Sequence, residues 1–259
     1  MELTQMKEEN IIEALERNNR WWKGDFSLDF KPRGVYEIIK KFMHTRQIIA
    51  ITGLRRVGKT TIILKIVEDF ISKFSRENVV YFTFDEFRDL VVNDVLKIYA
   101  RLMNKDLNKE RYLFLLDEIQ KIENWEEQLK SLYDAYPNIK FIISGSESLF
   151  IRKKSKESLA GRIYEFKINP LNFKEFLDFR NQKINNFFIQ KEKIIKNFKQ
   201  FLITSGFPEI INSNEEEARK YINEGIIDKI IYKDLSEVFG IKNPSLIKSV
   251  FNIIHNNPG

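Results

Sequence analysis

The stretch that decides the fold covers residues 47–61 and reads Gln-Ile-Ile-Ala-Ile-Thr-Gly-Leu-Arg-Arg-Val-Gly-Lys-Thr-Thr. Residues 53–60 follow the pattern Gly-x-x-x-x-Gly-Lys-Thr, which is typical of a phosphate-binding loop. In such a loop backbone N–H groups surround the phosphates, Lys59 reaches the β- and γ-phosphates, and the Thr60 hydroxyl binds Mg²⁺. The predicted nucleotide contacts are Gly53, Arg55, Arg56, Val57, Gly58, Lys59, Thr60 and Thr61.

The flanking segments distinguish a phosphate site from a glycine-rich turn with an incidental lysine. Residues 47–52 form a short apolar run typical of a buried strand. After the loop, the apolar residues of 60–74 recur at helical spacing. The motif requires a strand, a glycine loop and a helix in this order, because the helix start then directs its free N–H groups at the phosphates. The context therefore favours a nucleotide-binding loop.

Composition excludes several other kinds of site. The 259 residues contain no cysteine, which excludes disulfides, thiolate metal sites and cysteine nucleophiles. The two histidines, His44 and His255, are too few for a histidine-based metal centre. The net charge of +6 permits contact with nucleic acid without establishing it. Because no long apolar run and no apolar leader occur, we expect a cytoplasmic protein without a membrane partner.

The order of predicted elements indicates an α/β fold. Apolar runs predict five strands, and helical patterns separate the first four of them. Near-continuous apolar strands that alternate with helices predict a parallel sheet covered on both faces. Helical patterns follow, and the expected divisions are 1–172 for the sheet domain, 173–235 for a helical region and 236–259 for a last segment. The predicted strands are 47–52, 79–84, 112–117, 140–145 and 163–168.

A second motif, Leu-Phe-Leu-Leu-Asp-Glu over residues 113–118, follows the Walker B pattern. The carboxyl end of a parallel strand is where open α/β sheets bind ligands. We expect Asp117 to hold Mg²⁺ and Glu118 to orient or deprotonate the attacking water. Any strand can end in acids, but this pair lies about 60 residues after the phosphate loop, on a separate predicted strand.

Two further polar segments are open to two interpretations each. Ser144 and Ser146 end the next predicted strand, where a hydroxyl could contact the γ-phosphate, or could belong only to a Ser/Gly turn. Arg162 precedes the last strand and is either a catalytic arginine for a neighbouring subunit or a surface residue. Arg55 and Arg56 add positive potential near a nucleotide, or face solvent or another protein.

Taken together, these motifs resemble the AAA+-type and STAND-like P-loop ATPases of archaea and bacteria. The resemblance rests on residues 53–61, 115–120, 144–146, on Leu-Ala-Gly-Arg at 159–162, and on Gly-Phe-Pro-Glu at 206–209. It implies a five-stranded parallel sheet of the ASCE type with helices on both faces, in which the strand ending at Ser146 separates the Walker B strand from the phosphate-loop strand. A small α-helical lid and the start of a winged-helix-like region would follow.

The same resemblance assigns roles to individual residues. It makes Ser144 or Ser146 a sensor of the γ-phosphate, Arg162 an arginine finger supplied to a neighbouring subunit, and Pro208 an adenine contact. It also implies that residues 21–24 and 32–36 lie near the base. One departure is the lack of a clear second sensor arginine in the lid, where Arg219 is the nearest candidate.

The resulting hypothesis is a Mg²⁺-dependent ATPase that changes shape with its ATP or ADP state and is slow without a partner. The alternative is a DNA-associated module that uses ATP as a structural or regulatory ligand. A third reading is a signalling or defence switch whose output domain lies outside this chain, which we expect to be truncated because residues 245–255 resemble the first helix of a winged-helix region. A homo-oligomer, DNA or another protein are the expected partners.

Overall fold

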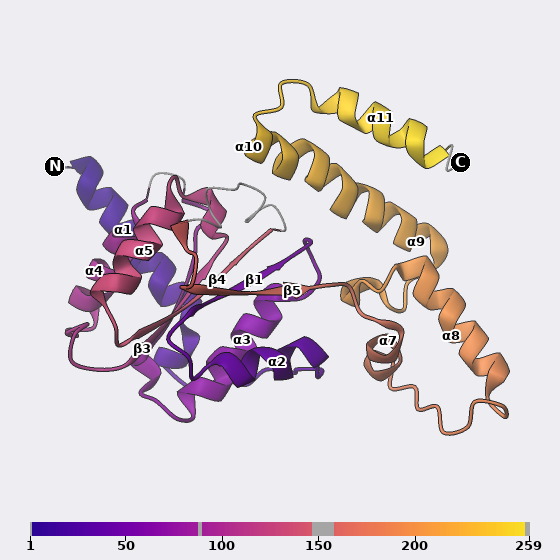
Figure 1. Ribbon diagram of the computed structural model, residues 1–259, viewed down its shortest axis with the longest axis horizontal. Coiled ribbons are helices and arrows are strands. Elements are labelled where there is room, and N and C mark those ends of the chain that lie inside the picture. The colour runs from indigo at the N-terminus through magenta and orange to yellow at the C-terminus, as the bar shows by residue number, and fades with distance from the viewer. Residues whose placement is uncertain (1, 88–89, 147–157, 257–259) are drawn as a thin grey trace. The chain divides into compact units, whose positions relative to one another are not determined.

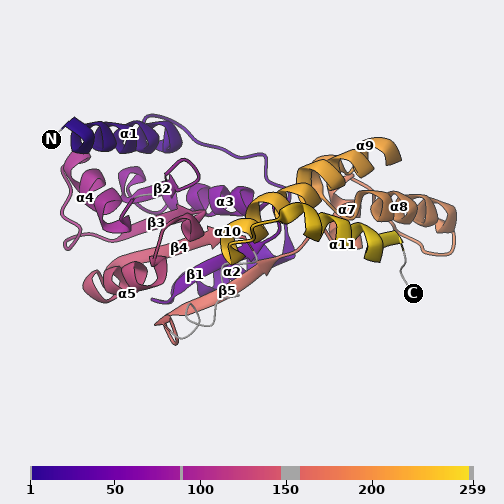
Figure 2. The same ribbon diagram turned by 90° about the horizontal axis from the view of Figure 1, so that it is seen from above.

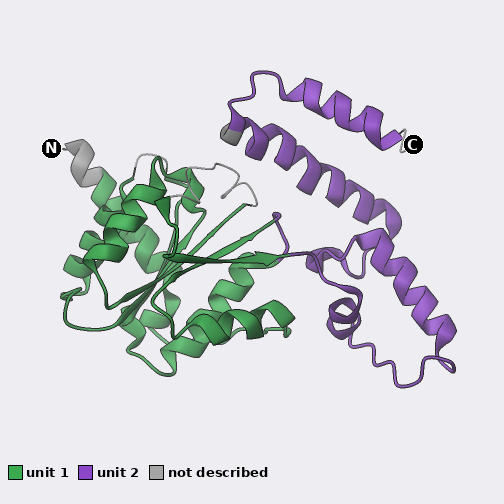
Figure 3. Ribbon diagram, viewed as in Figure 1, with its two compact units in different colours: residues 1–53, 58–168 green, residues 54–57, 169–259 purple. Residues whose placement is uncertain are grey.

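Five strands form one parallel sheet in the order β2-β3-β4-β1-β5. The computed structural model describes residues 2–87, 90–146 and 158–256 (Figure 1). These divide into an amino-terminal unit, residues 1–53 and 58–168, and a carboxy-terminal unit, residues 54–57 and 169–259 (Figure 3). The strands are β1 (Ile48–Gly53), β2 (Val79–Thr83), β3 (Tyr112–Asp117), β4 (Ile139–Gly145) and β5 (Ile163–Ile168).

The sheet confirms the predicted α/β class and the predicted neighbours of the phosphate-loop strand. Strand β4 pairs with β1 on one side and with β3 on the other, so it separates the Walker B strand from the phosphate-loop strand. Every residue of β1 and β3 is buried, as expected for central strands of a parallel sheet that helices cover on both faces. The carboxyl ends of β1, β3 and β4 therefore meet at one edge.

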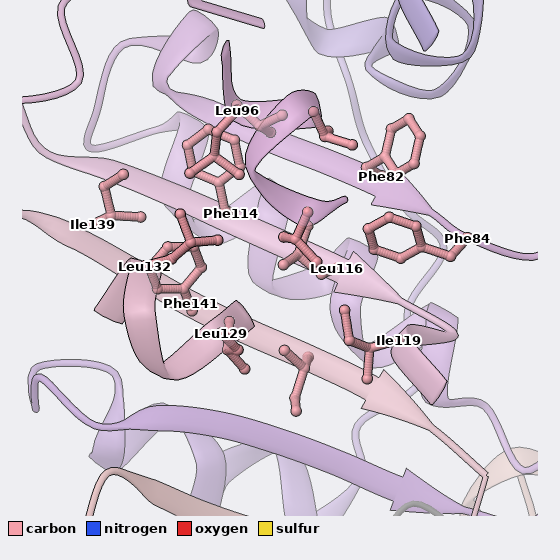
Figure 4. Close-up of a cluster of buried hydrophobic side chains, with 14 of the residues drawn as sticks. Phe82, Phe84, Leu96, Phe114, Leu116, Ile119, Leu129, Leu132, Ile139 and Phe141 are labelled. Atoms are coloured by element: carbon pink, nitrogen blue, oxygen red, sulfur yellow. The ribbon is translucent and has the colours of Figure 1, made fainter. Parts of the chain in front are cut away.

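The main core fills one face of the sheet. Helices α1 (Glu2–Asn18), α4 (Val92–Leu102) and α5 (Trp125–Ala135) pack there against alternate side chains of the strands. Figure 2 shows α1 running beside α4. Phe82, Phe114 and Phe141 come from three neighbouring strands and are fully buried in this cluster (Figure 4). Helices α2 (Gly34–Phe42) and α3 (Lys59–Ile71) lie on the opposite side.

The segment after α1 is anchored at the amino edge of the sheet. The indole N–H groups of Trp21 and Trp22 donate to the carbonyl of Val79 at 2.8 and 3.0 Å. Val79 is the first residue of β2, whereas the phosphate loop follows the carboxyl end of β1. The expectation that residues 21–24 lie near the base of a nucleotide is therefore wrong. Burial of the Trp21 ring against the start of β2 accounts for their position.

The carboxy-terminal unit is helical. Asn172 and Asn214 begin α7 and α9 with capping boxes closed by Glu175 and Glu217. Gly206 has a φ of +71°, and a Cβ there would stand 2.4 Å from the Leu171 carbonyl oxygen, so only glycine fits this turn. The elements are α7 (Phe173–Phe179), α8 (Lys191–Thr204), η5 (Pro208–Ile210), α9 (Glu215–Lys220), η6 (Tyr221–Ile227), η7 (Ile230–Leu235), α10 (Ser236–Phe239) and α11 (Pro244–Asn256).

Two features of these helices bear on the expectations above. The turns η6 and η7 are wound as π-helix between α9 and α10, in the stretch 215–233 where the sequence pattern indicates helix. Helix α11 covers the segment expected to begin a winged-helix region. Across the described ranges, no helix combines the length and the apolar character needed to cross a bilayer.

Candidate nucleotide-binding site

The phosphate loop connects β1 to α3 with the geometry that its glycines allow. Gly58 has a φ of +95°, a left-handed conformation that disfavours residues with a Cβ. Lys59 is the first residue of α3 and is buried, with 7% of its surface exposed. Its Nζ atom donates to the carbonyl oxygen of Gly53 at 3.0 Å. The lysine ammonium therefore lies against the loop, where a phosphate group would need a cation.

Asp117 is the centre of a hydrogen-bond network at the carboxyl edge of the sheet. Its carboxylate accepts from the Thr60 hydroxyl at 3.2 Å, the Tyr81 hydroxyl at 2.8 Å and the Ser144 hydroxyl. The backbone N–H of Glu118 donates to the same carboxylate at 3.0 Å. Asp117 is 4% exposed, so these donors replace the water that a buried carboxylate needs. The structure thus brings together Thr60, Asp117 and Ser144, three of the predicted site residues.

Tyr81 is a site residue that sequence reasoning missed. It lies on β2, next to β3, and its ring is buried while its hydroxyl reaches Asp117. Burial, followed by repulsion from the Asp117 charge and by the hydrogen bond to it, raises the pKa of Tyr81, so the hydroxyl stays a donor. The available signal was a hydroxyl within the apolar run at 79–84, which also contains Thr83. The neighbours of this strand are known only from the fold.

We expect Tyr81→Phe to lower the affinity of the site for Mg²⁺ more than it lowers the stability of the fold. Removing the donor leaves Asp117 less firmly oriented, and loss of such a supporting contact typically costs about 10–100-fold in metal affinity or activity. The measurement is the Mg²⁺ concentration that gives half-maximal ATP turnover. Tyr99→Phe is the matched control, because Tyr99 is also buried but its hydroxyl donates to the Glu77 carbonyl at 2.7 Å. Equal Mg²⁺ midpoints in both variants would contradict the assigned role.

Glu118 occupies a strained position directly after β3. Its φ of +53° is unusual for a residue other than glycine, and such outliers concentrate at functional sites. The Gln120 side-chain amide donates to the Glu118 carboxylate. Arg56, inside the phosphate loop, has a similar φ of +63°. The sharp turn at Glu118 leads from β3 into η3 (Ile119–Lys121). A water-orienting role of Glu118 stays a prediction.

The two predicted serines occupy different environments. The Ser144 hydroxyl lies on β4 and donates to Asp117, so it belongs to the network at the Walker B aspartate. Ser146 follows the last residue of β4 and is 9% exposed. A role for either hydroxyl toward a γ-phosphate stays a prediction.

Arg162 lies at the amino edge of the sheet. Its carbonyl accepts from Ile48 N–H, and β5 begins one residue later, opposite the start of β1. The six residues of β1 separate this edge from the phosphate loop by about 20 Å. The guanidinium pairs with Asp134 at 3.1 Å. Arg162 therefore cannot serve its own loop, and supply to a neighbouring subunit stays a prediction.

The remaining loop residues belong to the carboxy-terminal unit. Arg55 makes a bidentate contact with Asp234 on η7, with N···O distances of 2.7–3.0 Å, and both side chains are largely buried. Arg56 pairs with Glu209 at 3.1 Å, and its guanidinium lies 4.8 Å from the Tyr221 ring centroid. Both arginines thus have carboxylate partners, which neither the phosphate nor the solvent interpretation predicted.

The other predicted contacts are distributed over both units. In the amino-terminal unit, Gly58 lies beside Arg33. The Nη1 atom of Arg33 would be 3.8 Å from a Cβ placed on Gly58. Arg33 is 5% exposed, and its segment, residues 32–36, was expected near the nucleotide. Thr61 is exposed on α3, and Val57 is fully buried. In the carboxy-terminal unit, Pro208 begins η5 and Arg219 pairs with Glu215 on the surface of α9.

The donor set at the loop suits a hard cation such as magnesium. Within the described residues no group of three His, Cys, Asp or Glu side chains could hold a metal by itself. Thr60 and Asp117 instead offer a hydroxyl and a carboxylate 3.2 Å apart. Mg²⁺ prefers oxygen ligands and is usually held by one or two protein oxygens together with substrate phosphates. These two residues would therefore hold Mg²⁺ when a nucleotide is present.

Comparison with protein families gives two matches. A model described as an AAA domain matches residues 45–177, which include the phosphate loop and the Walker B acids. A second model, described as a domain of unknown function (DUF8612), matches residues 195–259.

Curated relatives are longer than this chain. An uncharacterized protein of Methanocaldococcus jannaschii, MJ1544, is 35% identical over 217 residues, which are 81% of this chain and 46% of that protein. An uncharacterized protein of Haemophilus influenzae is 29% identical over 222 residues, 85% of this chain and 54% of that protein. The chain spans about half the length of the curated relatives it matches.

Solved structures show distant likenesses. The Pif1 helicase from Candida albicans gives a TM-score of 0.40 with 14% identity, over 59% of this chain and 44% of that chain. The Orc1 protein of Aeropyrum pernix, solved in complex with DNA, gives a TM-score of 0.44 with 13% identity, over 62% of this chain and 51% of that chain.

Proposed function

The chain belongs to the AAA domain family, and we propose that it binds Mg·ATP at the phosphate loop, hydrolyses it, and changes conformation with nucleotide state. One observation supports this proposal above the others. The loop hydroxyl of Thr60 and the Walker B carboxylate of Asp117 are hydrogen-bonded to each other, although 57 residues separate them in sequence. The pair is the oxygen donor set that phosphoryl-transfer sites use for magnesium.

Each residue of the proposed site has a defined task in this reaction. Backbone N–H groups of the loop and the first turn of α3 bind the phosphates, and the Lys59 ammonium neutralises charge at the β- and γ-phosphates. Bound Mg²⁺ would supply charge neutralisation on the phosphate oxygens. Glu118 orients the attacking water and accepts its proton. Tyr81 and Ser144 hold Asp117 in one orientation by donating to its carboxylate.

The contacts of Arg55 and Arg56 support the switching part of the proposal. Within the carboxy-terminal unit both guanidinium groups are bound to carboxylates, Asp234 and Glu209. A guanidinium binds phosphate with the same bidentate geometry that it uses for carboxylate. Bound phosphates and these carboxylates would therefore compete for the same arginines. Gain or loss of the γ-phosphate changes that competition, which is the proposed origin of the conformational change.

Phosphate release from ATP, measured over a range of protein concentrations, tests this function. We expect Mg²⁺-dependent release that is slow at low concentration and rises more than linearly, because Arg162 can serve only the loop of a neighbouring subunit. The same series with DNA tests the DNA-associated alternative, for which added DNA would alter the rate in a salt-dependent way. Complete absence of hydrolysis at every concentration, with and without DNA, would contradict an ATPase.

A further inference from the structure

A second cavity lies in the amino-terminal unit, away from the phosphate loop. It has a volume of about 580 Å³, within the range of small-molecule sites. It opens at the amino ends of β2, β3 and β4, whereas the phosphate loop follows the carboxyl end of β1. Ile66, Val79, Leu113 and Ile139 supply apolar walls from α3 and the strands. Nothing in the proposed ATPase chemistry uses this cavity.

The cavity carries an excess of positive charge. Its lining includes Arg46, Lys73 and Arg111, and across the described part of the chain the side chains of Lys73 and Arg111 form no ion pair. Arg46 is held in place, because its guanidinium lies 4.3 Å from the Tyr133 ring centroid and donates to the Tyr133 carbonyl at 2.8 Å. Several cations thus face the cavity with few local counter-charges, as an anion site requires.

Asp69 and Lys140 are further charged groups of the lining, and both already have partners within the protein. Asp69 is the one carboxylate among the described lining residues, and it binds the Tyr36 hydroxyl and Lys65. Burial opposes ionisation of Asp69, yet hydrogen bonds from Tyr36 and Lys65 keep its pKa below the usual value. Lys140 donates to the carbonyls of Thr45 and Gln47 at 2.7 and 2.5 Å. Neither group competes for a ligand in the cavity.

A buried polar group of the lining lacks a partner. Asn78 is 5% exposed, and its side-chain nitrogen donates to the Glu110 carboxylate at 2.7 Å and to the Arg111 carbonyl at 3.2 Å. These two contacts fix the orientation of the amide. Its Oδ1 atom accepts no hydrogen bond from any described residue. This oxygen has almost no contact with solvent, so it lies within the wall and is closed off from a ligand in the cavity.

Aromatic rings complete the lining. Phe70 and Phe74 stack with ring centroids 5.3 Å apart and an angle of 6° between their planes. Phe74 is 38% exposed, so part of its ring is accessible. Tyr36 and Tyr112 also line the cavity. Flat faces of this kind bind aromatic ligands by stacking.

We propose that this cavity is a second ligand site that binds a nucleoside monophosphate. The phosphate would pair with Lys73 and Arg111, and the base would pack against Phe74. The proposal does not rest on ATP hydrolysis, because the cavity and the phosphate loop lie at opposite edges of the sheet.

Calorimetric titration with AMP tests the site in a Lys59→Ala chain, in which binding at the phosphate loop is removed. We expect one AMP per chain, and at least about tenfold weaker binding when Lys73→Glu and Arg111→Glu are combined, since two charge-assisted contacts are lost. Lys97→Glu with Lys109→Glu is the control, because these exposed lysines give an equal change in net charge and do not line the cavity. Phe74→Leu keeps apolar volume without the ring and is expected to weaken AMP binding severalfold.

Several outcomes would overturn this assignment. The first is that the Lys59→Ala chain does not bind AMP at millimolar concentration. The second is that the variant with Lys73→Glu and Arg111→Glu binds AMP as tightly as its parent. If adenosine bound as tightly as AMP, Lys73 and Arg111 would not bind the phosphate group. If inorganic phosphate bound as tightly as AMP, the aromatic rings would not bind the base. With Lys59 intact, the double charge variant is expected to hydrolyse ATP at the parent rate, so this site and the proposed ATPase can fail separately.

Discussion

Lys59→Ala is expected to lower ATP turnover by about 10²–10³-fold, the loss seen when one preorganised charge-stabilising donor is removed from a catalytic site. Lys59 is the one residue of the loop whose ammonium is held beside the loop carbonyl at Gly53, with 7% of its surface exposed. A cation at that position offsets the charge of the β- and γ-phosphates, and in a buried site water does not replace it.

The fold should tolerate this change. Alanine is a strong helix former at the first position of α3, and the lost contact to Gly53 is a single hydrogen bond worth about 1 kcal/mol. The measurement is steady-state phosphate release together with equilibrium binding of ATP. Lys97→Ala, an exposed lysine on α4, is the matched control and should leave both unchanged. Turnover within threefold of the parent in Lys59→Ala would exclude the loop as the phosphate site.

Glu118→Gln is expected to separate binding from hydrolysis. Glutamine keeps the shape of the side chain and its contact with Gln120, so the loop, Asp117 and bound ATP should be unaffected. It cannot accept the proton of the attacking water, and loss of a general base typically costs about 10²–10⁴-fold. We therefore expect ATP affinity close to that of the parent and strongly reduced phosphate release.

The neighbouring acid Glu123 provides the control for this variant. Glu123 is exposed and follows η3 (Ile119–Lys121), so Glu123→Gln makes the same chemical change a few residues from the site. Its turnover should equal that of the parent. If Glu123→Gln slowed hydrolysis as much as Glu118→Gln, the effect would come from local charge, and the water-activating role of Glu118 would be lost.

The sequence predicted the parts of the site that local patterns encode. The spacing of Gly53, Gly58 and Lys59 defines the loop, and the apolar run before Asp117 defines the strand that carries it. All five predicted strands occur with ends within a residue or so of their predicted positions. The central strands β1, β3 and β4 are nearly continuous apolar runs, whereas β5 lies at an edge and alternates apolar with polar residues. The order of β3, β4 and β1 followed from the family resemblance and is confirmed.

Other features depend on which segments the fold places side by side. Tyr81 reaches Asp117 only because β2 pairs with β3, and an apolar run does not encode its neighbours. Nothing in the sequence around Trp21 indicates which edge of the sheet it packs against. Its contact with Val79 is therefore known only from the structure. Arg162 is different. It precedes a parallel strand, so its distance from the loop could have been deduced from the sequence and the strand order together.

The most direct test of the central claim is a parallel measurement of bound ATP and released phosphate on one sample of Glu118→Gln with Mg²⁺. We expect one ATP to be retained per chain, with phosphate release at least about a hundredfold slower than in the parent. Release at the parent rate, or failure to bind ATP at all, would contradict hydrolysis at the site formed by Lys59, Thr60, Asp117 and Glu118.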